Sequence, residues 1–394
     1  MYSMGNTRIV PPRSNERGST MIMTAILMLG LLLCVGLCID ISRIYMTQTE
    51  LKNAADAAAL TAARELNSGS GGITDAVARA NAIVNNYGFN RQRITIANIE
   101  FAVNLNGNYV DAGTAFNAPD NIRFVRVTTQ TVSTAMLFSS SVLGGSRTQT
   151  GQSVAGMSVG LNTICDFFPV AVALTDPNPA PNTTMTLNFV QGTNNSATLA
   201  DRDYIVLEVP DINGNGSPET AVLSAGVTNM CQRISVNIPF HMTPSANMNN
   251  GPRQITDGIN TRFNIYGNGY GNALQPATYP PDSNVQQSIT FDQYKNRTAV
   301  TAPSPNGPGQ DDRRILVVPI IAPGTYTGSP VSAPTLKFGA FFLKNIATVS
   351  NPCSQGGPCG QLQVEWIDER LVVGRGGYDP GGGISNLTIP VLYK

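Results

Sequence analysis

Residues 17–66 read RGSTMIMTAILMLGLLLCVGLCIDISRIYMTQTELKNAADAAALTAAREL, and the rest of the chain is organised around this stretch. Residues 21–39 are apolar and uncharged, and about 19 such residues are long enough to cross a bilayer as one helix. Residues 40–66 contain no proline or glycine and are rich in good helix formers, so the helix is expected to continue. The sequence predicts one rod over residues 20–66, roughly 70 Å long, whose outer half stands clear of the membrane as a stalk.

Small side chains recur at helical spacing along the outer half of this rod. They are Ala54, Ala55, Ala58, Ala59, Ala62 and Ala63. Small residues in a row let another backbone approach closely, so we interpret this face as a packing seam. Its partner is either the chain's own globular part or a second helix, which would make a homo-oligomer. The alternative is that alanine serves there only as a good helix former.

Charges beside the apolar run predict its orientation. Arg8, Arg13 and Arg17 precede the run against Glu16 alone, whereas acidic and basic residues roughly cancel after it. The positive-inside rule places the N-terminus in the cytoplasm and the remainder of the chain outside. The apolar core is longer than that of a signal peptide, and no small-x-small cleavage site follows it closely. We therefore expect an uncleaved single-pass anchor.

Composition limits the classes of function. The net charge is zero and 13% of residues are charged, so no nucleic acid or anionic surface is expected as a partner. The 38 glycines and 26 prolines suit turn-rich β structure outside the membrane. A single histidine, His241, lies among apolar residues and prolines, which favours a structural or surface role over catalysis. We expect no enzyme.

The cysteines fall into two groups. Cys34 and Cys38 lie inside the apolar run and are interpreted as small apolar filler. The other four are Cys165, Cys231, Cys353 and Cys359, an even number that predicts disulfides in an oxidising compartment. The SQGGP loop between Cys353 and Cys359 suits one bridge, which would leave Cys165 with Cys231. Two other pairings remain open.

Residues after the rod predict a small mixed domain and then a β-rich one. Residues 67–72 (NSGSGG) break the rod, and Thr74 can cap a second helix. Strands are expected at 94–103, 121–132 and 148–160, with a short helix at 134–145. From residue 161 the pattern is mostly β, with a central strand at Ile315–Ile321, a helix at 253–266 and an edge strand at 387–393.

The predicted fold class is therefore α+β: a long N-terminal transmembrane helix continuing as a stalk, a small α+β head, and a mostly-β C-terminal domain. The predicted divisions are a cytoplasmic tail (1–17), the transmembrane helix and stalk (18–66), the small α+β domain (73–160) and a β-rich domain on the outer side of the membrane (161–394).

One segment carries a candidate metal site. DINGNGSPE, residues 211–219, places oxygen ligands in the alternating pattern of a calcium loop: Asp211, Asn213, Asn215, the carbonyl of Ser217, and Glu219. It departs from an EF-hand because the twelfth position is Val222. Two carboxylates predict modest affinity, about 10⁻⁴–10⁻³ M. An Asn-Gly-rich hairpin turn without metal is the alternative.

The N-terminal stretch resembles the Tad (tight adherence, Flp pilus) assembly proteins of the TadE/TadG-like type. The matching features are Arg17-Gly18, Asp40, the RIY of residues 43–45 and above all NAADAAAL at 53–60. The resemblance implies a bacterial inner-membrane anchor with its body in the periplasm, and other Tad assembly proteins or pilins as partners. Met23 stands where cleaved prepilins carry glutamate, and no Asp-x-Ser-x-Ser motif of a von Willebrand type A domain is present, so neither feature is expected.

Three hypotheses follow. The first is a non-catalytic structural or assembly component of a Tad (Flp) pilus or related secretion machine. The second is a calcium-stabilised extracytoplasmic binding or adhesion module. The third, an exported hydrolase using His241, has the least support in the sequence.

Overall fold

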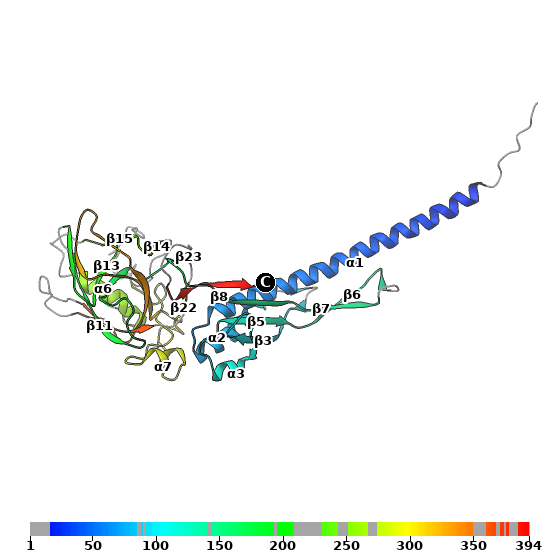
Figure 1. Cartoon of the computed structure of the whole chain (residues 1–394). Coiled ribbons are helices and arrows are strands. Elements are labelled where there is room, and N and C mark those ends of the chain that lie inside the picture. The colour runs from blue at the N-terminus through cyan, green and yellow to red at the C-terminus, as the bar shows by residue number, and fades with distance from the viewer. Residues whose placement is uncertain are drawn as a thin grey trace, which may run out of the picture.

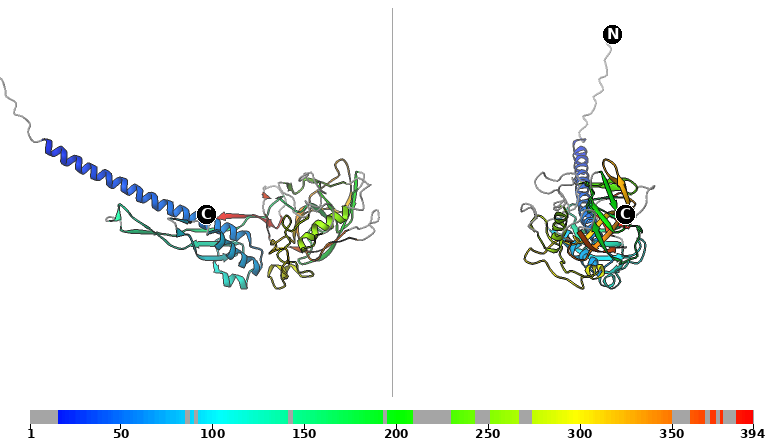
Figure 2. Two further views of the ribbon diagram at one scale, coloured as in Figure 1. Left: turned by 180° about the vertical axis from the view of Figure 1, so that it is seen from behind. Right: turned by 90° about the vertical axis from the view of Figure 1, so that its left-hand side faces the viewer.

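The computed structural model describes residues 16–84, 88–89, 92–140, 144–192, 195–208, 230–242, 251–266, 274–349, 360–367, 371–373, 376–377 and 385–393. They form three parts arranged end to end: a rod, a head packed against the end of the rod, and a body built from the described residues between 161 and 388 (Figures 1 and 2). The fold is α+β, as predicted, with few helices and a mostly-β region after the long N-terminal helix.

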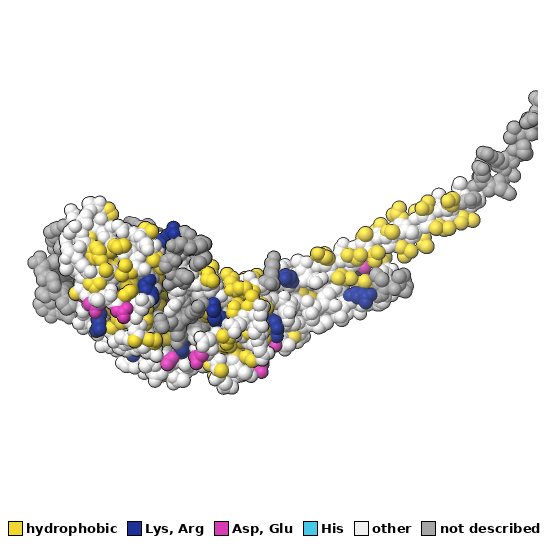
Figure 3. Space-filling model, viewed as in Figure 1, with side chains coloured by type: hydrophobic (Ala, Val, Ile, Leu, Met, Phe, Trp, Pro, Cys, Tyr) yellow, Lys and Arg dark blue, Asp and Glu magenta, His cyan; other side chains and the backbone are white. Residues whose placement is uncertain are grey.

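The rod is one continuous helix, α1 (Glu16–Arg64), of 49 residues. Its N-terminal half is apolar and uncovered, with side chains such as Leu27, Leu29 and Leu31 more than half exposed (Figure 3). Among the described residues α1 is the one helix long and apolar enough to cross a membrane. The predicted continuous helix is thus confirmed.

The head is a five-stranded antiparallel sheet with helices packed on it. Its strand order is β25-β8-β5-β3-β4. Its strands and helices are β3 (Ile96–Ala102), β4 (Val110–Asp111), α3 (Ala112–Asn117), β5 (Phe124–Thr129), β8 (Gln152–Met157), β25 (Pro390–Tyr393) and α2 (Ser70–Val84), with a small β1–β2 pair (Gly88–Phe89, Gln92–Arg93). The C-terminal part of α1 packs on this sheet beside α2. The outer half of the rod, predicted as a stalk with a packing seam, thus packs into the head, where Leu51, Leu66 and six of the alanines between them are buried.

Helix α2 begins earlier than predicted, at Ser70 rather than near Thr74. The reason is close backbone packing at two glycines. A Cβ on Gly71 would lie 2.2 Å from the carbonyl oxygen of Lys295, and one on Gly72 would lie 2.6 Å from that of Glu65. The glycines that break the rod therefore also let α2 start against the body.

A hairpin extends from the head along α1 toward its apolar half (Figure 1). We call it the arm; it consists of β6 (Val132–Ala135) and β7 (Ser146–Gln149), paired antiparallel from Val132↔Gln149 to Ala135↔Ser146. The predicted helix at 134–145 is wrong for residues 134–139, which form the end of β6 and a turn; residues 141–143 lie outside the described residues. The predicted strand 148–160 is two strands, which separate where Gly151 crosses closely over the backbone of α1.

The body is built on a closed sheet. Seven strands pair in the order β11-β13-β10-β16-β19-β21-β20, and β11 also pairs with β21, which closes the sheet into a barrel. The strands are β10 (Val170–Ala173), β11 (Thr184–Phe189), β13 (Asp203–Val206), β16 (Ile315–Ile321), β19 (Lys337–Leu343), β20 (Thr348–Val349) and β21 (Gly360–Ile367). The predicted central strand Ile315–Ile321 lies in the middle of this order.

Every strand of the closed ring contributes to one apolar cluster, which includes Val172, Leu187, Tyr204, Val318 and Trp366. Helix α6 (Gly251–Asn260) adds Ile255 and Ile259 to this core and continues into η2 (Thr261–Phe263). The opposite face of the sheet forms a second cluster under α7 (Phe291–Lys295) and short strands. Those strands are β9 (Thr163–Cys165), β12 (Ser196–Leu199), β14 (Cys231–Arg233), β15 (Asn237–Pro239), β17 (Gly324–Thr327), β18 (Ser332–Pro334), β22 (Leu371–Val372), β23 (Gly376–Gly377) and β24 (Leu387–Thr388).

The chain crosses between head and body again near its last described residues. After β24 in the body, β25 returns to the head and pairs with β8, from Pro390↔Met157 to Tyr393↔Val154. The predicted edge strand at 387–393 thus divides into β24 and β25, and β25 is an edge strand of the head. The predicted domain boundary at residue 160 assigns β25 to the body, whereas β25 is a strand of the head.

Candidate functional site

The alanine face of α1 is occupied within the chain itself. The six alanines of this face are each 0% exposed: Ala54, Ala55, Ala58, Ala59, Ala62 and Ala63. The last four share one apolar cluster with Ala76 and Ala80 of α2 and with Val125 and Ala155 of the sheet. Ala54 belongs to a second cluster with Val84 and Ile94. A homo-oligomer through this face is therefore contradicted by the structure, because the head already fills the space that a second helix would need.

A polar contact holds the arm where the apolar run of α1 ends. The carboxylate of Asp40 is 1% exposed and accepts four hydrogen bonds from the turn of the arm. Its Oδ1 accepts from the backbone N–H of Leu137 (2.9 Å); its Oδ2 accepts from those of Phe138 (3.0 Å) and Ser139 (2.8 Å) and from the Ser139 hydroxyl (2.7 Å). We call this arrangement the Asp40 clasp. It stabilises the ionised carboxylate and satisfies the backbone donors of residues 137–139, the described turn that we call the tip of the arm.

Further contacts fix the arm on either side of the clasp. Toward the head, the Arg43 Nη1 donates to the carbonyl of Ala135 (3.1 Å), and the hydroxyls of Thr47 and Thr134 lie 3.1 Å apart. Toward the N-terminus, Phe138 lies directly on Gly36, where an added Cβ would be 2.5 Å from the Cβ of Phe138. The arm thus packs along about three turns of α1, from residue 36 to residue 47.

The tip of the arm presents apolar side chains outward. Leu137 is 59% exposed and Phe138 is 54% exposed, although their backbone N–H groups are bound by Asp40. Phe138 lies against Gly36 near the end of the apolar half of α1, and the backbone of Leu137 is bound at Asp40 just beyond it. The exposed apolar surface of the tip is therefore next to the apolar surface of α1.

Sequence reasoning did not find the Asp40 clasp. It noted Asp40 only as a feature of the resemblance, and it predicted a helix where the arm turns. The available signal was a lone acidic residue directly after an apolar run, which in a folded chain requires hydrogen-bond donors. Nothing local in the sequence indicates that those donors come from residues 137–139.

A second polar centre lies buried in the body. Asp282 is 0% exposed; its Oδ1 accepts from the Asn284 N–H (2.8 Å), and its Oδ2 accepts from the Tyr294 hydroxyl (2.9 Å) and the Arg314 N–H (3.0 Å). Burial raises the pKa of Asp282 to about 6, against these hydrogen bonds and the nearby guanidinium, which lower it. Burial also lowers the pKa of Arg314 to about 10. The bond from Arg314 ties the loop around residue 282 to the start of β16, and the bond from Tyr294 ties it to α7.

Head and body meet across a cleft of about 610 Å³. The Arg297 guanidinium of the body lies 2.6 Å from the Asp75 carboxylate of α2. Arg79 lies 3.8 Å from both Glu65 and Asp311. The Arg297–Asp75 and Arg79–Asp311 pairs join the body to the head, whereas Arg79 and Glu65 both belong to the head.

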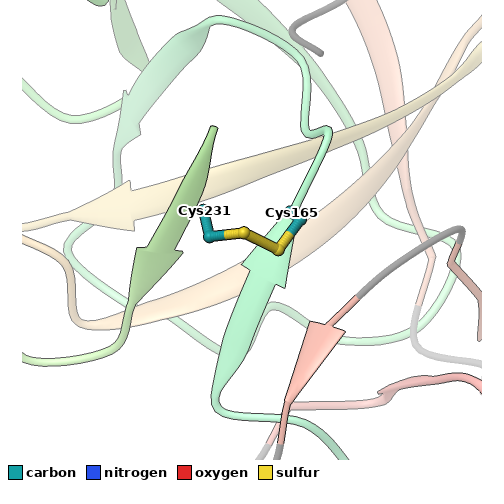
Figure 4. Close-up of a disulfide and its surroundings, with 2 residues drawn as sticks. All are labelled: Cys165 and Cys231. Atoms are coloured by element: carbon teal, nitrogen blue, oxygen red, sulfur yellow. A yellow bond between two sulfur atoms is a disulfide. The ribbon is translucent and has the colours of Figure 1, made fainter. Parts of the chain in front are cut away.

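A disulfide joins β9 to β14 in the body (Figure 4). Cys165 and Cys231 stand directly opposite each other in an antiparallel pair, with their Cα atoms 4.0 Å apart. This is the pairing predicted for these two residues. Cys353 and Cys359 lie outside the described residues, and Cys34 and Cys38 are free and exposed on the apolar half of α1.

The predicted calcium ligands Asp211, Asn213, Asn215, Ser217 and Glu219 all lie outside the described residues, so calcium binding there stays a prediction. Within the described ranges no group of three or more His, Cys, Asp or Glu side chains is placed to hold a metal ion. His241 is partly buried, and its Nδ1 lies 2.8 Å from Oε2 of Glu208, in an ion pair if the ring is protonated.

The described fold defines a class of protein in which one N-terminal helix, long and apolar enough to span a membrane, ends inside a globular head. Residues 18–65 match the Tad family model, described as putative Flp pilus-assembly TadE/G-like. The matched residues run from the start of the apolar half of α1 to the end of the alanine face, and they include Asp40. The chain therefore carries a TadE/G-like domain, which supports a role related to Tad pilus assembly. No curated protein and no solved structure matches the chain.

Proposed function

We propose that this chain is a non-catalytic structural or assembly component of a Tad (Flp) pilus or related secretion machine. In this proposal α1 anchors it once in the bacterial inner membrane, and head and body stand on the periplasmic side. The observation that carries the proposal is the family match over residues 18–65, which coincides with a helix whose apolar half is almost entirely uncovered by the rest of the described chain.

Two further features support the proposed orientation. Arg8, Arg13 and Arg17 precede the apolar half of α1, as the positive-inside rule requires of a cytoplasmic N-terminus. The Cys165–Cys231 disulfide belongs to the part proposed to be exported, where oxidising conditions let such bonds persist.

The structure also supports a way for the anchor to position the body. Helix α1 passes without a break from the apolar half into the core of the head, and the head is joined to the body by charge pairs and by the return of β25. The proposed role is to hold the body at a defined height and angle over the membrane, next to other Tad assembly proteins or pilins.

Orientation is tested with the full chain carrying an N-terminal tag. In spheroplasts, added protease should digest the body and leave the tag intact; digestion of the tag with a protected body overturns the proposed topology. The role is tested by deleting the gene in a host that makes Tad pili and counting pili by electron microscopy. Complementation with the full chain should restore pili, and pili in normal number without the gene contradict the proposal.

A further inference from the structure

We propose that the tip of the arm, carrying Leu137 and Phe138, inserts into the lipid surface beside α1 and gives the head a second contact with the membrane. This inference rests on the proposed spanning role of α1 and adds to it a lipid-binding site that the family match does not cover, since the match ends at residue 65.

The tip lies at the level of the apolar run of α1. Phe138 lies on Gly36, and Gly36 precedes Ile39, the last residue of the uncharged apolar run. At 1.5 Å per residue this contact lies about 4.5 Å inside the apolar end of the helix. A side chain at that level is beside lipid whenever the apolar run is in lipid.

The polar backbone groups of the tip are satisfied by hydrogen bonds to α1. A segment that enters lipid must have its backbone N–H groups satisfied within the protein, because no water is available there. Asp40 accepts hydrogen bonds from three successive N–H groups and from the Ser139 hydroxyl, and Arg43 donates to the Ala135 carbonyl. The tip therefore offers the bilayer apolar side chains while these polar groups are already bonded.

The apolar side chains of the tip are exposed in the described structure. Leu137 and Phe138 are adjacent, and each exposes more than half of its surface, whereas Met136 and Ser139 beside them are buried. Water is an unfavourable environment for two adjacent large apolar side chains, and lipid is a favourable one. Because this surface adjoins the apolar half of α1, which is proposed to lie in lipid, lipid is the partner that covers it.

The two contacts together would restrain the head. A single helix leaves the head free to tilt and rotate about the membrane normal, because tilt is set by packing and by interfacial anchors. A second membrane contact at a fixed place on the head would restrict the tilt of the head. The arm would then set which face of the body is presented to neighbouring assembly proteins.

The test uses tryptophan quenching by lipids brominated near the headgroup end of the acyl chain, with the full chain in vesicles. The chain's single tryptophan, Trp366, is buried in the barrel and supplies a constant background. The Phe138→Trp variant should lose much of its added emission in brominated vesicles. Val103→Trp, at the end of the head nearest the body, is the matched exposed control and should lose none. Leu29→Trp, near the middle of the apolar run of α1, is measured in vesicles of lipids brominated near the methyl end of the acyl chain and reports spanning itself.

Each outcome decides between the two proposals. Quenching of Leu29→Trp without quenching of Phe138→Trp overturns the lipid contact and leaves the anchor standing, as would occur if the tip binds a partner helix instead. Absence of quenching at both positions overturns both proposals. Adding Asp40→Asn to the Phe138→Trp variant should reduce quenching to the level of Val103→Trp, because the amide cannot accept all four bonds; unchanged quenching overturns the role given to the Asp40 clasp. Circular dichroism confirms that each variant is folded.

Discussion

The buried guanidinium of Arg314 provides the most direct test of how the body is held together. Its side chain is 0% exposed, and every nitrogen donates to a backbone carbonyl. Nε donates to Leu343 (2.9 Å), Nη1 to Asn284 (2.9 Å) and Gln286 (2.8 Å), and Nη2 to Lys344 (3.1 Å). These carbonyls belong to the end of β19 and to the loop at residues 284–286, so one side chain joins two segments far apart in the sequence.

Replacing Arg314 by Met keeps an unbranched apolar stem and removes the guanidinium with every one of its donors. Four buried carbonyl oxygens would lose a partner, and Asp282 would lose its neighbouring cation. The guanidinium also lies 4.6 Å from the ring centroid of Phe263 and 4.5 Å from that of Phe342, and these cation–π contacts would be lost. Breaking a buried ionic centre of this kind costs about 3–5 kcal/mol, so we expect that loss in the free energy of unfolding of the body.

Trp366 makes the measurement specific to the body, because it is the only tryptophan and is 1% exposed in the barrel core. Urea unfolding of the full chain in detergent, followed by its fluorescence, gives the free energy for each variant. Arg314→Lys should lose less than Arg314→Met because it keeps the charge. Arg202→Met, on the surface, should change the free energy by less than about 0.5 kcal/mol. A loss below about 1 kcal/mol for Arg314→Met would refute the structural role argued here.

Three further predictions concern the body and its junction with the head. The folded pKa of Asp282 (about 6) exceeds the ordinary value of 3.8, so its ionised form costs stability above pH 6 and this cost is relieved as the pH falls. Lowering the pH from 7 to 5 should therefore stabilise the body by about 1 kcal/mol more in the wild type than in Asp282→Asn, and equal changes in urea titrations would contradict this. Gly71→Ala places a methyl group 2.2 Å from the Lys295 carbonyl oxygen and should speed amide hydrogen exchange at the start of α2, at a cost of about 1–3 kcal/mol; unchanged exchange would show that the junction yields easily. Replacing Cys165 and Cys231 together by serine opens a loop with a sequence separation of 66 and should cost about 4 kcal/mol in urea unfolding, whereas an unchanged midpoint would mean that the unfolded chain is compact without the bond.

Local pattern predicted the long elements well. The apolar run and the alanine-rich continuation specify α1 by composition alone, and the apolar run Ile315–Ile321 specifies a buried strand. Segments whose structure depends on distant partners were predicted poorly. Residues 134–139 are helix-compatible in isolation, but they form an extended strand and a turn because the arm packs on α1 and Asp40 binds the turn.

At the candidate site, too, the features set by local sequence could be predicted and the contacts between distant residues could not. The alanine face was predicted as a packing seam, yet the sequence could not choose between a second helix and the chain's own head. That choice depends on the sheet residues Val125 and Ala155, which follow the seam by more than sixty positions. The Asp40 clasp and the Arg314 centre each join residues close in space and distant in sequence, so periodicity carries no signal for them.

The return of β25 has a consequence for biogenesis. Among the described strands it is the last to be translated, and it supplies the outer partner of β8 in a sheet whose other members are made much earlier. While the barrel is still being synthesised, the edge of β8 is an unpaired ladder open to other chains. A nascent molecule therefore has a period in which it is vulnerable to mispairing, and this period ends when Leu392 and its neighbours reach the head.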